Sequence, residues 1–441
     1  MKILFITQHF PPEKGAVRRI FEFAQYFAKE GHDISIVTAI PNYPDGIVPP
    51  KYRGKFYDYE EMENLKIHRN WVLPASNNQP KKRMLGFLTF LFSTLVNSHK
   101  LKGDYDLLIA SSPPIATPLI GYLMSKIKKC RFVLEVRDLQ PQSSEDFGNL
   151  NPSLFTRMLK RYMDYIYSKT DQIVGVTEGI SYFLKNNVKD KSKVFTIKSG
   201  VGQEFINSEA NGIRKRFGWD EKFLVMYAGT LGWAHSLEIF IESARQLNDK
   251  TDIKFVFVGD GQKREVLESM VCDYGLKNVD FIGIQPLDSI PDFLQASDVL
   301  VHCMKDVPIA KGNLPSKLFE YMAAGKPILY GASGGEAVDE LEKAGGALVF
   351  RTEDSDRLSE LILDLRDGTI VGSSLGEKYH QYILNNHCRE KWAGEYLKNL
   401  KDPHYQESLI PELVNQVADN HEPENQEIEN QEVIIQEQVN H

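Results

Sequence analysis

Short apolar runs alternate with helix-like patterns along the first half of the chain. Residues 2–7 form an apolar run, apolar residues then recur every three or four positions until Gly31, and a second run follows at residues 34–37. Further apolar runs are residues 105–110, 132–136, 172–176 and 194–197. This alternation is typical of strand-helix-strand units with a parallel sheet, so residues 1–200 are predicted to form one Rossmann-like domain.

The same alternation begins again after a polar segment, SGVGQEFINSEANG, which we interpret as a hinge. Apolar runs follow at residues 223–228, 254–258, 279–282, 299–303, 327–330 and 347–350. The sequence therefore predicts an α/β protein in which two doubly wound Rossmann-like domains, residues 1–200 and 205–375, face each other across a cleft. Closing helices are predicted at residues 376–402, and an acidic, disordered tail at residues 403–441.

The composition adds limits on partners and location. Hydrophobic residues make up 42% and charged residues 25% of the 441 positions, as in ordinary globular proteins. The net charge of −8 equals that of residues 411–441, which contain eight acidic residues and no lysine or arginine. The remainder is close to neutral, which argues against a nucleic-acid partner. The four cysteines are widely spaced and the first strand lacks the pattern of a signal peptide, so we expect a cytoplasmic protein.

The stretch GNLPSKLFEYMAAGKP, residues 312–327, combines a helix start, a lysine and a glutamate. Pro315 and Ser316 favour the first turn of a helix, whose spare N–H groups, together with the Lys317 ammonium, can hold a phosphate. Glu320 lies one turn deeper, where its carboxylate can accept hydrogen bonds from both hydroxyls of a ribose. The alternative interpretation is an ordinary amphipathic helix with a surface pair between Lys317 and Glu320.

Other candidate ligand contacts follow predicted strands, because ligands of doubly wound sheets bind at the carboxyl ends of the strands. Gly229 and Thr230 follow one strand of the second domain, and Gly259 follows the next. Gly15, in the turn after the first strand, can let a backbone approach a ligand closely. A D-x-D sequence at residues 104–106 enters a strand instead of leaving one, so we expect no metal site there.

The sequence GASGG, residues 331–335, matches the G-x-S-x-G pattern of a hydrolase nucleophile elbow and follows a predicted strand. In this alternative Ser333 is the nucleophile. The acids and bases that a hydrolase needs follow in chain order: Asp354 or Asp356, then His380 or His387. The other interpretation is a glycine-rich loop in which the N–H groups at Ser333, Gly334 and Gly335 bind a diphosphate.

Two further segments have alternative interpretations. Residues 41–59 are rich in proline and aromatic residues and form either an acceptor-binding flap or a surface loop packed on its own side chains. Lys81, Lys82 and Arg83 precede a thirteen-residue apolar stretch. Residues 81–96 therefore form either a helix in peripheral contact with a membrane surface or a buried helix of the domain.

Together these motifs resemble those of the retaining glycosyltransferases of family four, which have the two-domain GT-B fold, and more narrowly the bacterial branch that builds surface polysaccharides. The resemblance extends from Met1 to about Leu400 and rests on QHFPPEKGAVRR, on the VGDG turn with FIGIQPLDSIPDFLQASDVLV, and on LPSKLFEYMAAGKP. It implies transfer of a hexosyl or N-acetylhexosaminyl group, with retention, from a nucleotide diphosphate sugar to a lipid-linked or saccharide acceptor. It also implies O-antigen, capsule or exopolysaccharide synthesis at the cytoplasmic face of the membrane, without a metal or other cofactor.

The resemblance also implies roles for particular residues. Glu320 would hold the ribose, and Gly15 would leave room for the phosphates. The helix that begins near Pro315 and the loop from Ser333 to Glu336 would face the diphosphate or the sugar. Because charge develops on the leaving diphosphate, Lys317 is expected to stabilise it in place of a metal ion.

The sequence departs from the family pattern at several positions. Gly312 stands where many members have a second glutamate, and Thr230 and His235 stand where many have an arginine and a lysine. Arg137, beside Asp138, stands where a histidine is common. We interpret these differences as subfamily variation in an active enzyme, with His235 at the diphosphate and Arg137 and Asp138 at the acceptor or reacting centre. The alternative is a catalytically silent nucleotide-sugar-binding subunit.

Overall fold

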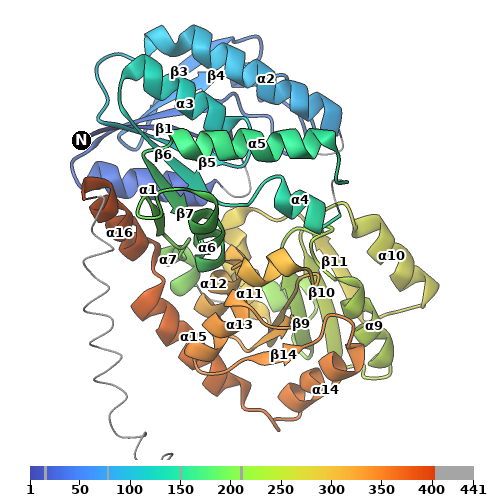
Figure 1. Ribbon diagram of the computed structural model, residues 1–441. Helices are drawn as coiled ribbons and strands as arrows, with labels where there is room; N and C mark the ends of the chain where they lie inside the picture. Colours follow the sequence, from blue (N-terminus) through green and yellow to red (C-terminus); the bar gives the residue numbers. More distant parts are fainter. Residues whose placement is uncertain (14–16, 77–78, 149–150, 209–211, 403–441) are drawn as a thin grey trace, which may run out of the picture. The chain divides into compact units, whose positions relative to one another are not determined.

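The computed structural model describes residues 1–13, 17–76, 79–148, 151–208 and 212–402 (Figure 1). Residues Met1–Gly394 form one compact unit that contains two β-sheets. The chain from Glu395 onward forms a second unit, of which the structure describes only the end of helix α16 (Arg389–Lys401) and Asp402. The tail predicted at residues 403–441 lies outside the described residues.

The first sheet has eight strands in the order β3-β4-β2-β1-β5-β6-β7-β8. Its strands are β1 (Lys2–Ile6), β2 (Asp33–Ala39), β3 (Tyr57–Met62), β4 (Leu65–Asn70), β5 (Leu107–Ser112), β6 (Arg131–Val136), β7 (Gln172–Gly175) and β8 (Val194–Thr196). All neighbouring strands are parallel except β3 and β4, which form an antiparallel hairpin. In the middle of the sheet, Ile3 lies opposite Ile34 of β2 and Leu107 of β5.

Helices cover both faces of this sheet, because its strands bury both of their sides. The helical segments are α1 (Arg18–Lys29), η1 (Pro50–Tyr52), α2 (Pro80–Val96), η2 (Asn97–Lys100), α3 (Thr117–Lys128), α4 (Gln142–Asp146), α5 (Leu154–Lys169) and α6 (Glu178–Asn187). Phe90 of α2 and Met163 of α5 share a core cluster with Leu4 of β1. The next residue, Phe5, instead packs against Phe27 of α1. Consequently α2 and α5 lie on one face of the sheet and α1 on the other (Figure 1).

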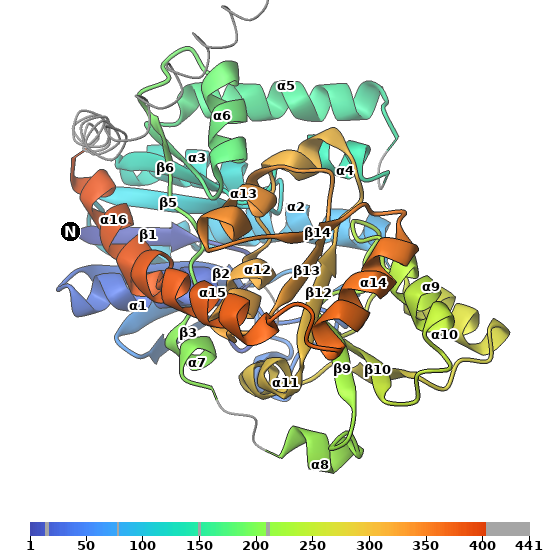
Figure 2. The same ribbon diagram turned by 90° about the horizontal axis from the view of Figure 1, so that it is seen from below.

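The second sheet has six parallel strands in the order β11-β10-β9-β12-β13-β14. Its strands are β9 (Phe223–Ala228), β10 (Ile253–Val258), β11 (Val279–Gly283), β12 (Val299–Cys303), β13 (Ile328–Gly331) and β14 (Leu348–Phe350). The helical segments are α7 (Gln203–Ile206), α8 (Ile213–Phe217), α9 (Glu238–Gln246), α10 (Arg264–Asp273), η3 (Leu287–Ser289), α11 (Ile290–Ala296), η4 (Pro308–Gly312), α12 (Ser316–Ala323), α13 (Glu336–Lys343), α14 (Ser355–Arg366) and α15 (Gly372–Asn386). Side chains of α11, α12 and α15 share one core cluster and those of α9 and α14 another, so helices lie on both faces (Figure 2).

These two doubly wound sheets confirm the predicted α/β class. The predicted strands are present, but the hairpin of β3 and β4 was not predicted, and the expectation of a parallel sheet is wrong at this edge. Its turn is made by Glu63 and Asn64, which have φ angles of 49° and 66° without a glycine to mark the turn. Residues 57–59, assigned by prediction to a loop, are the first residues of β3.

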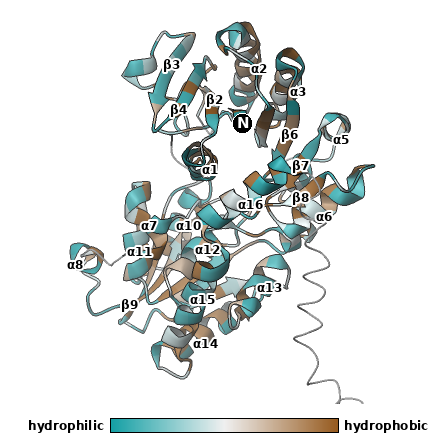
Figure 3. Cartoon of the chain, turned by 90° about the vertical axis from the view of Figure 1, so that its left-hand side faces the viewer, coloured by the Kyte–Doolittle hydropathy of each residue, from teal (hydrophilic) through white to brown (hydrophobic). Residues whose placement is uncertain are grey.

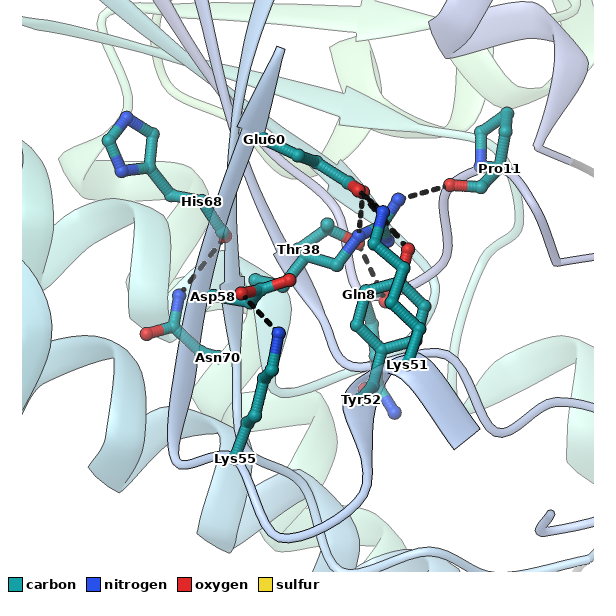
Figure 4. A network of polar contacts seen from close by, with 11 residues as sticks. Gln8, Pro11, Thr38, Lys51, Tyr52, Lys55, Asp58, Glu60, His68 and Asn70 are labelled. Atoms are coloured by element: carbon teal, nitrogen blue, oxygen red, sulfur yellow. Dashed lines mark hydrogen bonds and ion pairs between the residues drawn. The ribbon is translucent and has the colours of Figure 1, made fainter. Parts of the chain in front are cut away.

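A buried arginine holds this hairpin against the rest of the sheet, and its partners Glu60 and Pro11 are labelled in Figure 4. Arg69 of β4 is fully buried, and its guanidinium forms an ion pair with Glu60 of β3 and donates a hydrogen bond to the carbonyl oxygen of Pro11. Lys51 and the Tyr52 hydroxyl also contact the Glu60 carboxylate. Because Pro11 lies in the turn after β1, this network connects the proline-rich segment to that turn.

Candidate functional site

The start of α12 is fixed against the carboxyl end of β9. The Tyr321 hydroxyl accepts a hydrogen bond from the Ala228 amide at 2.8 Å and donates one to the Ala228 carbonyl oxygen at 3.1 Å. The apolar face of this helix, formed by Leu318, Tyr321 and Met322, is completely buried. The helix begins at Ser316, and Pro315 caps it with φ −60° and ψ 131°, so Pro315 lies just before the first turn instead of within it.

Lys317 points toward the turn that follows β9. Its Nζ atom lies 3.3 Å from the Tyr227 hydroxyl, and a Cβ atom on Gly229 would overlap the Lys317 ammonium. Gly229 is therefore the residue that makes space for this cation. Burial lowers the pKa of Lys317 to about 8, because an ammonium loses hydration inside the protein.

Glu320 lies one turn further along α12, with its side chain half-buried. Burial raises the pKa of its carboxyl group to about 7, although Arg389, Lys317 and Arg18 oppose the increase. Across the described part of the chain, its carboxylate has no hydrogen-bond or ion-pair partner, and the surface pair with Lys317 is not formed. The carboxylate can therefore accept hydrogen bonds from a ligand.

Two histidines lie beside Lys317. His235 and His302 meet edge to face with ring centroids 5.1 Å apart, and His302 also stacks on Tyr330. His302 is completely buried, and neither of its ring nitrogens has a partner among the described residues. Burial, followed by the charge of Lys317, lowers the pKa of His235 to about 3, so the ring is neutral near pH 7. His302 was not predicted; the only signal was a polar residue near the carboxyl end of the run VLVHC.

Two glycine turns pack together at this end of the sheet. A Cβ atom on Gly259 would overlap the carbonyl oxygen of Gly229, and one on Gly261 would overlap that of Leu231. Thr230, which lies between Gly229 and Leu231 in the chain, is exposed. Its carbonyl oxygen accepts a hydrogen bond of 2.7 Å from the Tyr227 hydroxyl. The turns after β9 and β10 therefore form one rigid unit beside Lys317.

The loop after β13 supplies the remaining predicted contacts. The Ser333 hydroxyl donates a hydrogen bond of 2.7 Å to the Asp306 carboxylate. Gly334 and Gly335 have φ angles of 121° and 108°, and Gly335 caps α13. The Glu336 carboxylate accepts hydrogen bonds of 2.8 Å from the amides of Glu178 and Gly179 at the start of α6.

The hydrolase alternative is not supported by this geometry. His380 contacts the carbonyl oxygen of Ala323 at 2.6 Å, and His387 contacts the Glu340 carboxylate at 3.0 Å. Asp354 caps α14, and Asp356 accepts a hydrogen bond from Gln246. Neither histidine is placed to activate Ser333, whose partner is a carboxylate.

The segment before α12 touches the first domain. The Thr177 hydroxyl donates a hydrogen bond of 2.8 Å to the Gly312 carbonyl oxygen, and a Cβ atom on Gly179 would overlap the Gly312 Cα atom. Gly312, predicted as the position of a missing glutamate, is thus part of a close backbone contact. A Cβ atom at position 312 would lie 3.2 Å from the Gly179 Cα atom, so any side chain there would start from a tight contact.

Arg137 and Asp138 follow β6, at the carboxyl end of the first sheet. The Arg137 guanidinium donates a hydrogen bond of 3.2 Å to the Pro113 carbonyl oxygen, and burial lowers its pKa. The Asp138 carboxylate accepts a hydrogen bond of 2.6 Å from the Gln140 side chain. Gly15 lies outside the described residues.

The proline-rich segment is also fixed at this end of the first sheet. The Glu13 carboxylate accepts hydrogen bonds from the Asn42 and Tyr43 amides at 2.8 and 2.9 Å and contacts His9 at 2.8 Å. Tyr52 is buried, while Phe56 stacks on Trp71. The segment therefore packs against the turn after β1 and against Trp71, which follows β4, and its role in acceptor binding remains a prediction.

The described residues also bear on the expectations for metal ligands and cysteines. No three of their histidine, cysteine, aspartate or glutamate side chains are grouped closely enough to hold a metal ion. At the D-x-D sequence, Asp106 accepts a hydrogen bond of 2.6 Å from the Lys2 amide, where β5 begins. All four cysteines are free thiols.

The helix of residues 81–96 is only partly buried, unlike the buried helix that was one of its two interpretations. Five large apolar residues of α2 are exposed: Met84, Leu85, Leu88, Phe92 and Val96. Only its opposite side, with Phe90 and Ser93, is buried in the domain. Within the described ranges, no helix has both the length and the apolarity needed to cross a bilayer.

Comparisons with known proteins identify the family. Residues 14–205 match Glycosyltransferase Family 4, and residues 210–385 match Glycosyl transferases group 1. Together these two matches cover most of the chain, and the protein belongs to the family-four glycosyltransferases with the GT-B fold.

Individual relatives and structures agree with this assignment. The putative colanic acid biosynthesis glycosyl transferase WcaI of Escherichia coli is 26% identical over 338 residues, 74% of this chain and 82% of that protein. The N,N'-diacetylbacillosaminyl-diphospho-undecaprenol alpha-1,3-N-acetylgalactosaminyltransferase of Campylobacter jejuni is 27% identical over 43% of this chain and 50% of its own length. The crystal structure of Anabaena HepE in complex with UDP and glucose superposes with a TM-score of 0.69 at 15% identity, covering 91% of this chain and 100% of HepE.

Proposed function

We propose that this protein transfers a sugar from a nucleotide diphosphate sugar to a lipid-linked or saccharide acceptor in polysaccharide synthesis, with retention at the anomeric carbon. The observation that carries the proposal is the position of Lys317. Its ammonium lies in the space left by Gly229, at the start of α12, with the unpaired Glu320 carboxylate one turn deeper. A cation at a helix start suits a diphosphate, and an unpaired carboxylate one turn deeper can accept hydrogen bonds from the ribose hydroxyls.

Each part of the donor then has a partner. The diphosphate binds Lys317 and the free amides at the start of α12, with His235 beside it and the loop at Ser333 and Gly334 on its other side. The Glu320 carboxylate accepts hydrogen bonds from the ribose hydroxyls. When the bond between sugar and phosphate breaks, negative charge grows on the diphosphate, and the fixed ammonium and amides stabilise it. In this proposal no metal ion is needed.

The acceptor approaches from the first domain. Arg137 and Asp138 follow β6 and lie at the end of their sheet where ligands of doubly wound domains bind. For a hexosyl or N-acetylhexosaminyl transfer, Asp138 is suited to position the acceptor hydroxyl, and Arg137 to balance charge. The lipid-linked acceptor named for the relative of Campylobacter jejuni, and the exposed apolar side of α2, support an acceptor at the cytoplasmic face of a membrane.

A panel of donors tests the proposal. The purified protein is incubated with UDP- and GDP-sugars and a polyprenyl diphosphate acceptor, and both binding and product are measured. We expect binding and turnover with at least one donor, and a reduction of both in Lys317→Met. If no nucleotide sugar binds, the donor assignment is wrong.

A second candidate function is a nucleotide-sugar-binding subunit without catalysis. The observation that favours it is the close contact of Gly312 with Gly179 of α6, at the position where the family pattern has a glutamate. In the same panel, binding of a donor without any product would support this candidate. Product formation that Glu320→Gln and Lys317→Met reduce would exclude it.

A further inference from the structure

Exposed apolar side chains are concentrated on three helices of the first domain. Of the twenty large hydrophobic residues that are exposed in the described chain, ten lie on these helices. They are Met84, Leu85, Leu88, Phe92 and Val96 on α2, Ile127 on α3, and Leu154, Phe155, Met158 and Tyr165 on α5. Figure 3 shows hydrophobic residues in brown along α2 and α3. Such a concentration marks a surface that binds something apolar.

The three helices present one continuous surface. Phe90 of α2, Ile120 of α3 and Met163 of α5 belong to the same core cluster, so the three helices pack on the same face of the first sheet. Tyr122 of α3 contacts Tyr165 of α5 edge to face at 6.0 Å, which places these helices side by side. The side of each helix that is turned away from the sheet is therefore part of a shared outer surface, which we call the α2/α3/α5 face.

The spacing of the apolar residues makes one stripe on each long helix. On α2, Leu88, Phe92 and Val96 are four residues apart, which is one helical turn. On α5, Leu154 and Met158 are also one turn apart, at its amino-terminal end. Leu154, with 69% of its surface exposed, is the most exposed of the ten residues, and Met158 of α5 and Phe92 of α2 follow with 60% each. The start of α5 is therefore as apolar and as accessible as α2.

The charge of these helices is opposite to that of the chain. They carry nine basic residues: Lys81, Lys82, Arg83, Lys126, Lys128, Arg157, Lys160, Arg161 and Lys169. Asp164 is their one acidic residue, so their net charge is +8, whereas the whole chain has −8. Basic residues next to an apolar stripe are typical of helices that lie in the interface of an anionic membrane. Two copies of this face would repel each other, which disfavours self-association through it.

We propose that α5 is a second membrane-binding element, and that the α2/α3/α5 face binds the surface of an anionic bilayer. Leu154, Phe155 and Met158 enter the interface between headgroups and acyl chains, and Arg157 and Arg161 pair with anionic headgroups. This extends the contact of α2 alone, because it places the start of α5 on the membrane. In the chain α5 follows Arg137, Asp138 and α4. Delivery of a lipid-linked acceptor along this route rests on the proposed function; binding to the bilayer does not.

Flotation with vesicles tests the proposal on the full chain. The protein is mixed with vesicles of phosphatidylcholine, with and without phosphatidylglycerol, and the floated fraction is measured. We expect binding to the anionic vesicles only, and about a tenfold weaker partition for Phe155→Gln/Met158→Gln, because two inserted apolar side chains are lost. The matched control is Val266→Gln on α10, a residue that is 44% exposed on the second domain and is expected to have no effect.

The outcomes distinguish membrane binding through α5 from membrane binding through α2 alone and from self-association. If the α5 variant floats like the unchanged protein while Leu88→Gln/Phe92→Gln does not, α2 acts alone and the proposal is overturned. It is also overturned if the protein does not bind anionic vesicles, or if light scattering shows a dimer that the α5 variant separates. An Arg157→Glu/Arg161→Glu variant must weaken binding at low salt. Melting temperature and UDP affinity should be unchanged in every variant, so a failure to bind nucleotide would concern the proposed function and not this surface.

Discussion

Gly312, just before α12, lies so close to Gly179 of α6 that a Cβ atom on Gly179 would overlap the Gly312 Cα atom. The Thr177 hydroxyl bonds to the Gly312 carbonyl oxygen, and Glu336 bonds to two amides of α6. A carboxylate at a helix start is favoured because the unpaired amides there carry partial positive charge. The residues on both sides of this contact therefore hold α6 against the segment to which we assign donor binding.

Replacing Gly179 by alanine should separate these segments. The Gly179→Ala side chain meets backbone atoms, which cannot move aside as a flexible side chain can. We expect kcat/KM for sugar transfer to fall about tenfold or more, because a displacement near one ångström misplaces reacting groups. Gly312→Ala is the matched control: its Cβ would lie 3.2 Å from the Gly179 Cα atom, which a shift of a few tenths of an ångström relieves. Equal activity in the two variants would contradict this account.

A second prediction concerns the space that Gly229 leaves for Lys317. In Gly229→Ala the new methyl group occupies the position of the ammonium, so Lys317 must turn away from the site. We expect the affinity for UDP or GDP, measured by calorimetry, to fall about tenfold to a hundredfold, as in Lys317→Met, because a charge-assisted hydrogen bond contributes about 1.5–3 kcal/mol. Gly232→Ala serves as the control, since its Cβ would meet only Thr230 Cγ2 at 3.6 Å. Unchanged affinity in Gly229→Ala would show that Lys317 does not bind the diphosphate.

A third prediction concerns a buried carboxylate between the two sheets. Glu340 is 1% exposed and binds Lys198 at 2.7 Å, His387 at 3.0 Å and the Tyr382 hydroxyl. These partners hold the pKa of Glu340 well below its usual range, despite the opposing effect of burial. Glu340→Gln leaves the Lys198 ammonium buried without a counter-ion and should lower the free energy of unfolding by about 3–5 kcal/mol.

Urea denaturation measures this loss. Because the pKa of Glu340 is lowered in the folded state, its contribution is present above the ordinary value of 4.5 and is lost as the pH falls below it. The difference between Glu340→Gln and the unchanged protein should therefore shrink in acid. Glu342→Gln, on the exposed side of α13, is the control and should change stability by less than about 0.5 kcal/mol. A similar loss in both variants would argue against a specific ion-pair effect.

Local patterns in the sequence predicted the strands and α12 because burial determines both. β1 and β9 are buried on two sides and appear as continuous apolar runs, and α12 has its apolar residues at helical spacing. The hairpin of β3 and β4 has no such pattern. Its strands contain YDYEEM and LKIHRN, whose polar residues are held by the contacts of Arg69 and Glu60 and not by an apolar face.

The parts of the site that depend on distant pairs could not be predicted. Local spacing put Lys317 and Glu320 on one helix, but the place of the Lys317 ammonium depends on Gly229, on another element. Gly312 suggested only a missing glutamate, because the contact with Gly179 is not visible in the sequence. His302 is not part of a sequence motif, and it is assigned to the site only because its ring contacts that of His235 in the structure.

A fourth prediction uses the pKa values of Glu320 and Lys317. A carboxylate accepts hydrogen bonds from ribose hydroxyls best when it is ionised, so donor affinity should rise with pH through about 7, the pKa of Glu320. The diphosphate needs the Lys317 ammonium, so affinity should fall again above its pKa of about 8. Calorimetric titration against pH should give a maximum between these values. Lys317→Met should remove the fall at high pH, and Glu320→Gln the rise at low pH.

The ionised Glu320 carboxylate should lower the stability of the folded protein, although it is expected to support donor binding. Because burial raises the pKa of Glu320 from 4.5 to about 7, the folded protein keeps a proton that the unfolded chain loses between these values. Glu320 therefore lowers stability as the pH rises through this range, and the full cost is present above pH 7. Glu320→Gln should raise the free energy of unfolding by about 1–3 kcal/mol at alkaline pH, and by little near pH 4.5, while donor affinity falls about tenfold. A Glu320→Gln variant that is destabilised at alkaline pH would contradict the assignment of Glu320 as a half-buried, unpaired carboxylate that binds a ligand.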